Sequence, residues 1–187
     1  MPATDKTIYL TFDDGPHPQA TVFALDELKK FEATATFFCL GKNVAEYPEV
    51  YARIVGEGHA IGNHTFNHLN GWKNKDDLYV NNVKIAAKYI DSNLFRPPYG
   101  RITRSQQKLL AGSPHKFSIV MWTVLSGDFD NAITADKCLE NVIGAAGNGS
   151  IVVFHDNEKA REKMSYALPK LLEYFCEKGY RFKRIDL

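Results

Sequence analysis

The chain has 187 residues and a formal net charge of +1, a length that suits one domain and leaves little room for a second. We therefore predict a single domain over residues 1–187. A charge so close to zero gives no electrostatic reason to expect nucleic acid or an anionic membrane surface as a partner. No run of roughly 18 apolar residues occurs, so we expect no membrane span.

Short β-rich runs alternate with longer segments of helical periodicity along the whole chain. The predicted strands, in chain order, cover residues 7–12, 35–40, 59–62, 94–96, 117–124, 150–155 and 180–185. The predicted helices between them cover residues 20–31, 44–56, 78–90, 101–110, 134–146 and 166–177. Thr134 is a suitable N-cap, Pro169 falls in the first turn of the last helix, and Gly179 follows its end.

Repeated strand–helix–strand units indicate parallel strands joined by right-handed crossovers. The continuous apolar runs 118–122 and 151–154 are typical of strands buried on both faces. No linker-like tract divides the chain. The sequence therefore predicts an α/β fold, a small or incomplete barrel of about seven parallel strands, with an open doubly wound sheet as the alternative.

Polar side chains gather where the predicted strands end, which in parallel α/β folds is the edge that binds ligands. The residues at these positions are Asp13, Asp14, His64, Arg96, Asp128 and His155. Stability alone does not require such a gathering, so we expect a functional site at this edge.

The segment 64–68 reads His-Thr-Phe-Asn-His and places two imidazoles four residues apart. If the segment forms a helical turn, both rings project to one side and can share a metal. The spacing alone is a weak signal, because such pairs often occur by coincidence. Adding one carboxylate, from Asp13 or Asp14, to His64 and His68 gives the three protein ligands of a typical catalytic zinc site.

Asp13 and Asp14 are adjacent acids followed by Gly-Pro, a combination usually found in solvated turns. Here they directly follow a buried strand, where unpartnered charge is costly. Neighbouring side chains leave a strand on different sides. One carboxylate can therefore ligate a metal while the other acts on a water molecule as general base.

Arg96 ends a strand and is followed by two prolines, Tyr99 and a glycine. One interpretation is a surface salt bridge. The other is a guanidinium that orients a carboxylate and keeps it ionised, with the backbone N–H of Tyr99 facing a developing oxyanion.

His155 ends the apolar run 151–154, a position where many histidines are only hydrogen-bonded core residues. Asp128 offers it a carboxylate partner, which would raise its pKa and suit it to protonate a leaving group. His17, His59 and His115 have no such company and are interpreted as structural or surface residues.

The chain resembles the polysaccharide deacetylases of the NodB-homology type, carbohydrate esterase family four, over roughly residues 8–182. The motifs that carry the resemblance occur in family order and read TFDDGP at 11–16, HTFNH at 64–68, RPPYG at 96–100, SGDFD at 126–130 and VVFHD at 152–156. The resemblance implies a NodB-like distorted (β/α) barrel of seven or eight strands, the fold of the glycoside hydrolase/deacetylase superfamily. It also implies that Asp14, His64 and His68 bind one divalent metal ion, usually zinc, with cobalt or nickel as alternatives.

By the same resemblance, Asp13 is the general base and His155 the general acid. Arg96 would orient Asp13, Asp128 would tune His155, and the Tyr99 amide would help to hold the oxyanion. The implied reaction is attack of water on an acetamide carbonyl and departure of acetate from the protonated amine.

Three positions depart from the family pattern. Phe129 stands where the family usually has tryptophan, Leu125 where it often has aspartate, and Val153 where it usually has leucine. These differences bear on the acetyl pocket and on substrate choice more than on the chemistry.

We therefore expect removal of acetyl groups from an N- or O-acetylated carbohydrate polymer or oligomer, such as peptidoglycan or chitin-type N-acetylglucosamine. The alternatives are a non-catalytic carbohydrate-binding module and a small-molecule amidase or esterase. Exposed aromatic residues beside the site would favour sugar stacking, and Phe129, Trp72 and Tyr99 are the candidates.

The first residues lack a secretory apolar core, which predicts a cytoplasmic protein if the chain is complete and a secreted or cell-envelope one if a leader preceded it. The sequence does not predict an oligomeric state.

Overall fold

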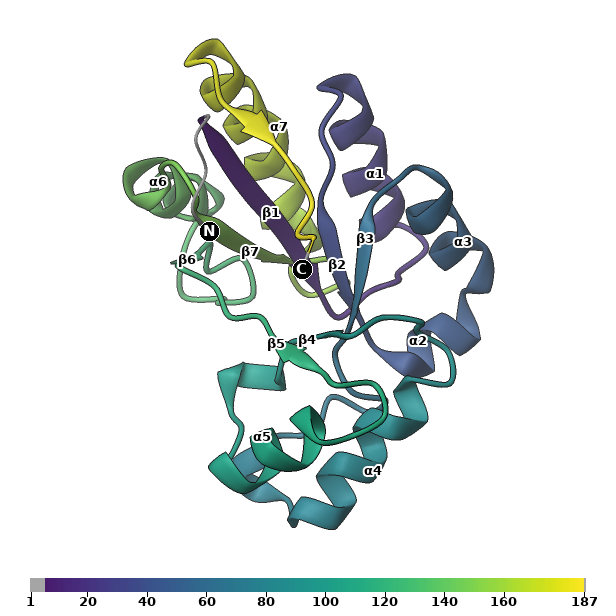
Figure 1. The fold of residues 1–187 in the computed structure, drawn as a ribbon. Coiled ribbons are helices and arrows are strands. Elements are labelled where there is room, and N and C mark those ends of the chain that lie inside the picture. Colours follow the sequence, from purple (N-terminus) through teal and green to yellow (C-terminus); the bar gives the residue numbers. More distant parts are fainter. Residues whose placement is uncertain (1–5, 187) are drawn as a thin grey trace.

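The computed structural model describes residues 6–186, which form one curled parallel sheet with helices around its outer side (Figure 1). The strands are β1 (Thr7–Asp13), β2 (Thr36–Cys39), β3 (Ala60–Asn63), β4 (Leu94–Phe95), β5 (Ser118–Ile119), β6 (Val124–Leu125), β7 (Ile151–His155) and β8 (Arg181–Phe182). Their order is β5-β4-β3-β2-β1-β7-β6, and β8 pairs with the first residues of β1.

The two edge strands of this order, β5 and β6, are consecutive in the sequence. Residues 120–123 alone connect them, and a connection of that length reaches at most about 18 Å even when fully extended. The two edges must therefore face each other, which curls the sheet into an incomplete barrel. The prediction of a distorted barrel with about seven parallel strands is confirmed, and the open doubly wound alternative is not.

The prediction of one continuous strand over residues 117–124 is wrong. The backbone N–H of Val120 donates a hydrogen bond to the carbonyl of Phe95 in β4, whereas the backbone N–H of Thr123 donates to the carbonyl of Ile151 in β7. Because the segment pairs with opposite edges at its two ends, it must leave one ladder before it joins the other.

Strand β1 lies inside the sheet between β2 and β7, and all seven of its residues are buried. The ring of Phe12 stacks on Phe37 of β2 with centroids 4.9 Å apart and on Phe154 of β7 at 6.2 Å. These side chains fill the layer between the sheet and the helices. The residues that follow β1 are therefore anchored by a strand that is buried along its whole length.

The helices are α1 (Ala20–Lys30), α2 (Gly41–Glu46), α3 (Pro48–Gly56), α4 (Asp76–Ala86), α5 (Arg104–Ala111), α6 (Ala135–Ala145) and α7 (Arg161–Glu177), with 3₁₀ turns η1 (Gly71–Lys73) and η2 (Pro98–Gly100). Figure 1 shows α7 packed between α6 and α1, while α4 and α5 lie below β4 and β5. None of the helices within residues 6–186 has the length and apolar character needed to cross a membrane.

Local backbone chemistry explains where the helices differ from expectation. The predicted helix 44–56 is two helices, because Tyr47 precedes Pro48 and has φ −125° and ψ 60°, outside the helical region. Helix α7 begins at Arg161, so Pro169 lies in its interior and not in its first turn as predicted. Thr134 caps α6 as expected, since its side chain accepts a hydrogen bond from the Lys137 N–H.

Candidate active site

A pocket of about 440 Å³ opens where β1, β3 and β7 end. The side chains that line it include Asp13, Asp14, His64, His68, Tyr99 and His155. Arg96 and Asp128 lie behind this wall and are fully buried. All eight residues singled out in the sequence thus lie in or directly behind one pocket.

Asp14, His64 and His68 form a three-donor group. The Oδ1 atom of Asp14 lies 3.2 Å from His68 Nε2 and 3.6 Å from His64 Nε2. Donor atoms around a tetrahedral cation with bonds of about 2.0–2.1 Å lie about 3.3 Å apart, close to these separations. Asp14 Oδ1 is buried and accepts no hydrogen bond from the described residues. An unpartnered buried oxygen facing two imidazoles fits a divalent cation.

The protonation of the group also suits a cation. Burial lowers the pKa of His64 in spite of the charges of Asp13 and Asp14, so the ring favours the neutral form. Its Nδ1–H donates to the Arg96 carbonyl at 2.7 Å, which leaves Nε2 as the free donor atom. Burial opposes ionisation of Asp14, but the contact with His68 and the imidazoles of His64 and His155 nearby lower its pKa below the usual range.

Residues 64–68 do not form the helical turn under which the two rings would project to one side; the imidazoles converge through a loop instead. Thr65 and His68 have φ values of 70° and 59°, in the left-handed region. The side-chain oxygen of Asn82, in α4, accepts the N–H groups of Phe66 and Asn67, each at 2.9 Å. The buried Asn82 side chain of α4 therefore holds the loop that brings the two histidines together.

Arg96 fixes the orientation of Asp13. Its Nη1 donates to Asp13 Oδ1 and to Thr11 Oγ1, each at 2.7 Å, and its Nε donates to the Val120 carbonyl. The guanidinium lies over the Phe38 ring at 4.1 Å and is fully buried, which excludes the surface salt bridge considered above. Oδ1 of Asp13 is thereby occupied, and Oδ2 is left for a water molecule in the pocket.

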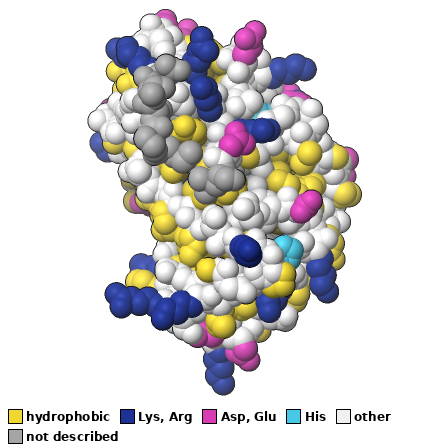
Figure 2. Space-filling view, viewed as in Figure 1, with side chains coloured by type: hydrophobic (Ala, Val, Ile, Leu, Met, Phe, Trp, Pro, Cys, Tyr) yellow, Lys and Arg dark blue, Asp and Glu magenta, His cyan; other side chains and the backbone are white. Residues whose placement is uncertain are grey.

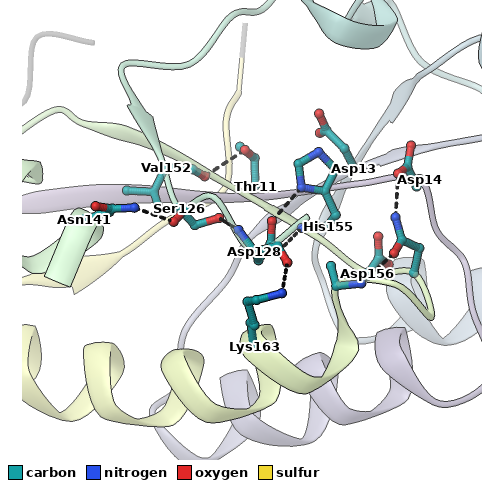
Figure 3. Close-up of polar contacts among 12 residues, drawn as sticks. Thr11, Asp13, Asp14, Ser126, Asp128, Asn141, Val152, His155, Asp156 and Lys163 are labelled. Atoms are coloured by element: carbon teal, nitrogen blue, oxygen red, sulfur yellow. Dashed lines mark hydrogen bonds and ion pairs between the residues drawn. The ribbon is translucent and has the colours of Figure 1, made fainter. Parts of the chain in front are cut away.

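His155 is the register partner of Asp13 on the neighbouring strand β7. Its Nδ1–H donates to Asp128 Oδ1 at 2.8 Å, and its backbone N–H donates to the other oxygen at 2.6 Å (Figure 3). Burial alone would lower the pKa of His155, but the charge of Asp128 and this hydrogen bond raise it to about 9. The imidazole is therefore protonated at neutral pH, and its Nε2 forms no hydrogen bond with the part of the chain that the structure describes.

Sequence reasoning missed the residues that hold Asp14. Asn157 Nδ2 donates to Asp14 Oδ2 at 2.7 Å, and Asn43 Nδ2 donates to the Asp14 carbonyl at 2.7 Å. Asp156 lies beneath them, fully buried, and its Oδ1 accepts the Gly15 N–H at 2.9 Å. Asp156 and Asn157 directly follow His155 at a strand end, so the strand-end rule could have found both.

The aromatic candidates separate into two groups. Phe129 and Tyr99 line the pocket, the former with its ring edge-on to His155 at 5.1 Å and the latter with its hydroxyl 3.1 Å from His68 Nδ1. Trp72 stands outside the pocket wall and is 60% exposed, beside Arg101. Leu125 and Val153 line the pocket, so all three departures from the family motifs meet there.

Residues 1–116 match the polysaccharide deacetylase family. A peptidoglycan-N-acetylglucosamine deacetylase of Bacillus cereus is 36% identical over 188 residues, which cover 97% of this chain and 67% of that protein. A chitooligosaccharide deacetylase of Azorhizobium caulinodans is 34% identical over 158 residues, covering 81% and 74% of the two chains. The solved structure of a peptidoglycan N-acetylglucosamine deacetylase in complex with 4-naphthalen-1-yl-N-oxidanyl-benzamide matches with a TM-score of 0.87 at 36% identity, over 97% of this chain and 86% of that one.

Proposed function

Because this chain belongs to the polysaccharide deacetylase family, we propose that it removes the acetyl group from N-acetylglucosamine units of peptidoglycan glycan strands. The observation that carries the chemistry is the convergence of a three-donor group, the Asp13–Arg96 pair and the His155–Asp128 pair in one pocket. The names of the B. cereus relative and of the matching solved structure support the choice of polymer.

We propose that Asp14, His64 and His68 hold a zinc ion, with cobalt or nickel able to replace it. Two imidazoles and one carboxylate, with room left in the pocket, are the donor set of catalytic zinc sites. When bound, the cation supplies Lewis acidity toward the acetamide carbonyl.

Asp13 is proposed as the general base. With Oδ1 held by Arg96, its Oδ2 takes a proton from the water molecule that attacks the carbonyl carbon. The Arg96 bonds to Thr11 and Val120 keep that carboxylate from turning as it gains the proton. The Tyr99 backbone N–H is proposed to donate to the oxyanion, and this role stays a prediction.

His155 is proposed as the general acid. Its raised pKa, about 9, keeps Nε2 protonated at neutral pH, and Asp128 accepts the Nδ1–H and fixes the tautomer. Transfer of the Nε2 proton to the sugar nitrogen lets the C–N bond break, so acetate and a free amine leave. The proton taken up by Asp13 and the one given by His155 balance, and the enzyme returns to its starting state by exchanging them with solvent.

The test is acetate release by zinc-loaded protein from peptidoglycan, from N-acetylglucosamine oligomers and from acetylated xylan. We expect release from peptidoglycan, and a higher kcat/KM for peptidoglycan strands than for chitin-type oligomers of equal length. Faster turnover of the chitin-type oligomers would favour the activity named for the A. caulinodans relative. No acetate from any of these substrates would reject the proposal.

A further inference from the structure

Two basic side chains border the pocket and have no acidic partner among the described residues. Arg101 and Lys159 line it, both are exposed, and neither forms an ion pair within residues 6–186. Arg161, two residues after Lys159, is by contrast paired with Glu158. Figure 2 shows Lys and Arg side chains at the lower left of the molecule, the end of the fold that carries α4 and α5 in Figure 1.

Arg101 is held in place although it is exposed. Its guanidinium carbon lies over the Trp72 ring, 4.0 Å from the ring centroid, and Trp72 Nε1 donates to the Ile102 carbonyl at 3.2 Å. The Gly71 N–H donates to the Arg101 carbonyl at 3.1 Å. A Cβ on Gly71 would lie 2.5 Å from that carbonyl oxygen, so a residue without a side chain is required for this close approach. The ring therefore supports the guanidinium, whose N–H groups form no ion pair with the described residues.

The two cations belong to loops on opposite sides of the reaction centre. Arg101 follows β4 and Lys159 follows β7, and strands β3, β2 and β1 lie between these two in the sheet. Asp14, which follows β1, and His64, which follows β3, are therefore flanked by one cation on each side. A sugar chain that crosses the pocket would bring the units next to the reacting one toward these cations.

We propose that Arg101, supported on Trp72, and Lys159 bind carboxylates carried by the sugars that adjoin the deacetylated unit. The fork of a guanidinium matches a carboxylate in two parallel hydrogen bonds, and Lys159 adds a mobile point charge. Two cationic side chains at these positions favour binding of an anionic glycan over a neutral one. The inference rests on the proposed function, because peptidoglycan strands carry lactyl or stem-peptide carboxylates on alternate sugars, whereas chitin-type oligomers carry none.

The experiment compares kcat/KM for three tetrasaccharides with alternating sugars. The first has free lactyl carboxylates, the second has the same groups blocked as methylamides, and the third carries stem peptides. We expect the kcat/KM of the wild-type protein to be roughly tenfold higher for the free-carboxylate form than for the blocked form. If the carboxylate that binds belongs to the stem peptide, the peptide form should show this advantage instead. The preference should shrink as salt is raised from low ionic strength.

The substitution R101Q should reduce this preference at least threefold, and R101Q combined with K159Q should abolish it. R104Q is the matched control, since Arg104 is exposed three residues further on and does not line the pocket. It should keep the wild-type ratio. Equal rates on the charged and blocked forms, or the same preference in R101Q and R104Q, would overturn the carboxylate site. Acetate release from none of the three would instead reject the proposed function itself.

Discussion

Asn157 Nδ2 donates a hydrogen bond of 2.7 Å to Asp14 Oδ2, while Asp14 Oδ1 faces the two imidazoles and has no hydrogen-bond partner within residues 6–186. One oxygen of the carboxylate is thus held by the protein and the other is presented to the site. A side chain that orients a ligand in this way typically changes metal affinity by 10- to 100-fold.

We therefore expect N157A to weaken zinc binding by about 10- to 100-fold, measured by competition with a chromophoric chelator. The Asn157 side chain also accepts the Ala160 N–H near the start of α7, so the variant should lose about 1 kcal/mol of stability as well. Measurements well below the melting temperature separate the two effects. N131A, at an exposed asparagine, is the control, and equal zinc affinity in both variants would contradict the positioning role.

Substitution D13N should lower kcat by about 10²–10⁴ and leave zinc binding intact, because the amide keeps the shape of the side chain but cannot take a proton. Acetate release and metal content are measured on the same preparation. D77N, at an exposed position of α4, should behave as wild type. A D13N protein that keeps more than a tenth of the activity would show that another group acts as base.

Removal of the metal by a chelator should stop acetate release, and zinc should restore it. Binding to the folded state alone stabilises by about 2.7 kcal/mol at a ligand concentration 100 times Kd, so zinc should also raise the melting temperature. H68A should lose both responses, whereas H115A, at an exposed histidine outside the site, should keep them. Stripped protein that hydrolyses as fast as loaded protein would refute the metal assignment.

The charge of Asp128 should control the titration of His155. In chelator-treated protein we expect the ring to titrate at a pKa of about 9, followed by NMR of its Hε1 proton. In D128N, burial is opposed only by the charges of Asp13 and Asp14, so the pKa of His155 should fall clearly below that of the wild type.

The sign of the accompanying stability change follows from the raised value. His155 stabilises the folded state fully below about pH 6.5, and this contribution is lost as pH rises through about 9. D128N should lack this loss in denaturant unfolding. An unchanged His155 titration in D128N would show that Asp128 does not set the pKa.

Asp156 provides a second test of pH dependence. Burial raises its pKa to about 7, although Thr21 and the Gly15 N–H donate to it. The folded state then holds a proton that the unfolded chain releases near pH 4, so stability falls as pH rises from about 4 through about 7. Each pKa unit corresponds to about 1.4 kcal/mol.

Substitution D156N keeps an oxygen for the Gly15 N–H and an amide that can donate to Thr21, and it cannot titrate. We expect urea unfolding at pH 5 and pH 8 to give a smaller difference for D156N than for wild type. An identical pH dependence in the two proteins would contradict a buried, proton-binding Asp156.

The barrel was predictable because its signals are local. Apolar runs that alternate with amphipathic segments indicate parallel strands and crossover helices, and His155 and Arg96 stand at strand ends in the sequence itself. The metal-binding and proton-transferring residue types can also be read directly from the sequence, since carboxylates and imidazoles have these properties wherever they lie. The sequence by itself thus determined the fold class, the family and the residues around which the site is built.

Only the tertiary structure decided how those residues meet. The register that places Asp13 beside His155 joins positions 142 apart, and no local pattern contains it. The left-handed backbone at Thr65 and His68 is sustained by Asn82 from α4, so the imidazoles converge without the helical turn that their spacing suggested. Side chains that act by orienting other side chains do so through contacts between residues far apart in the sequence. These contacts form only when the chain packs into its fold, so no local sequence pattern reveals them.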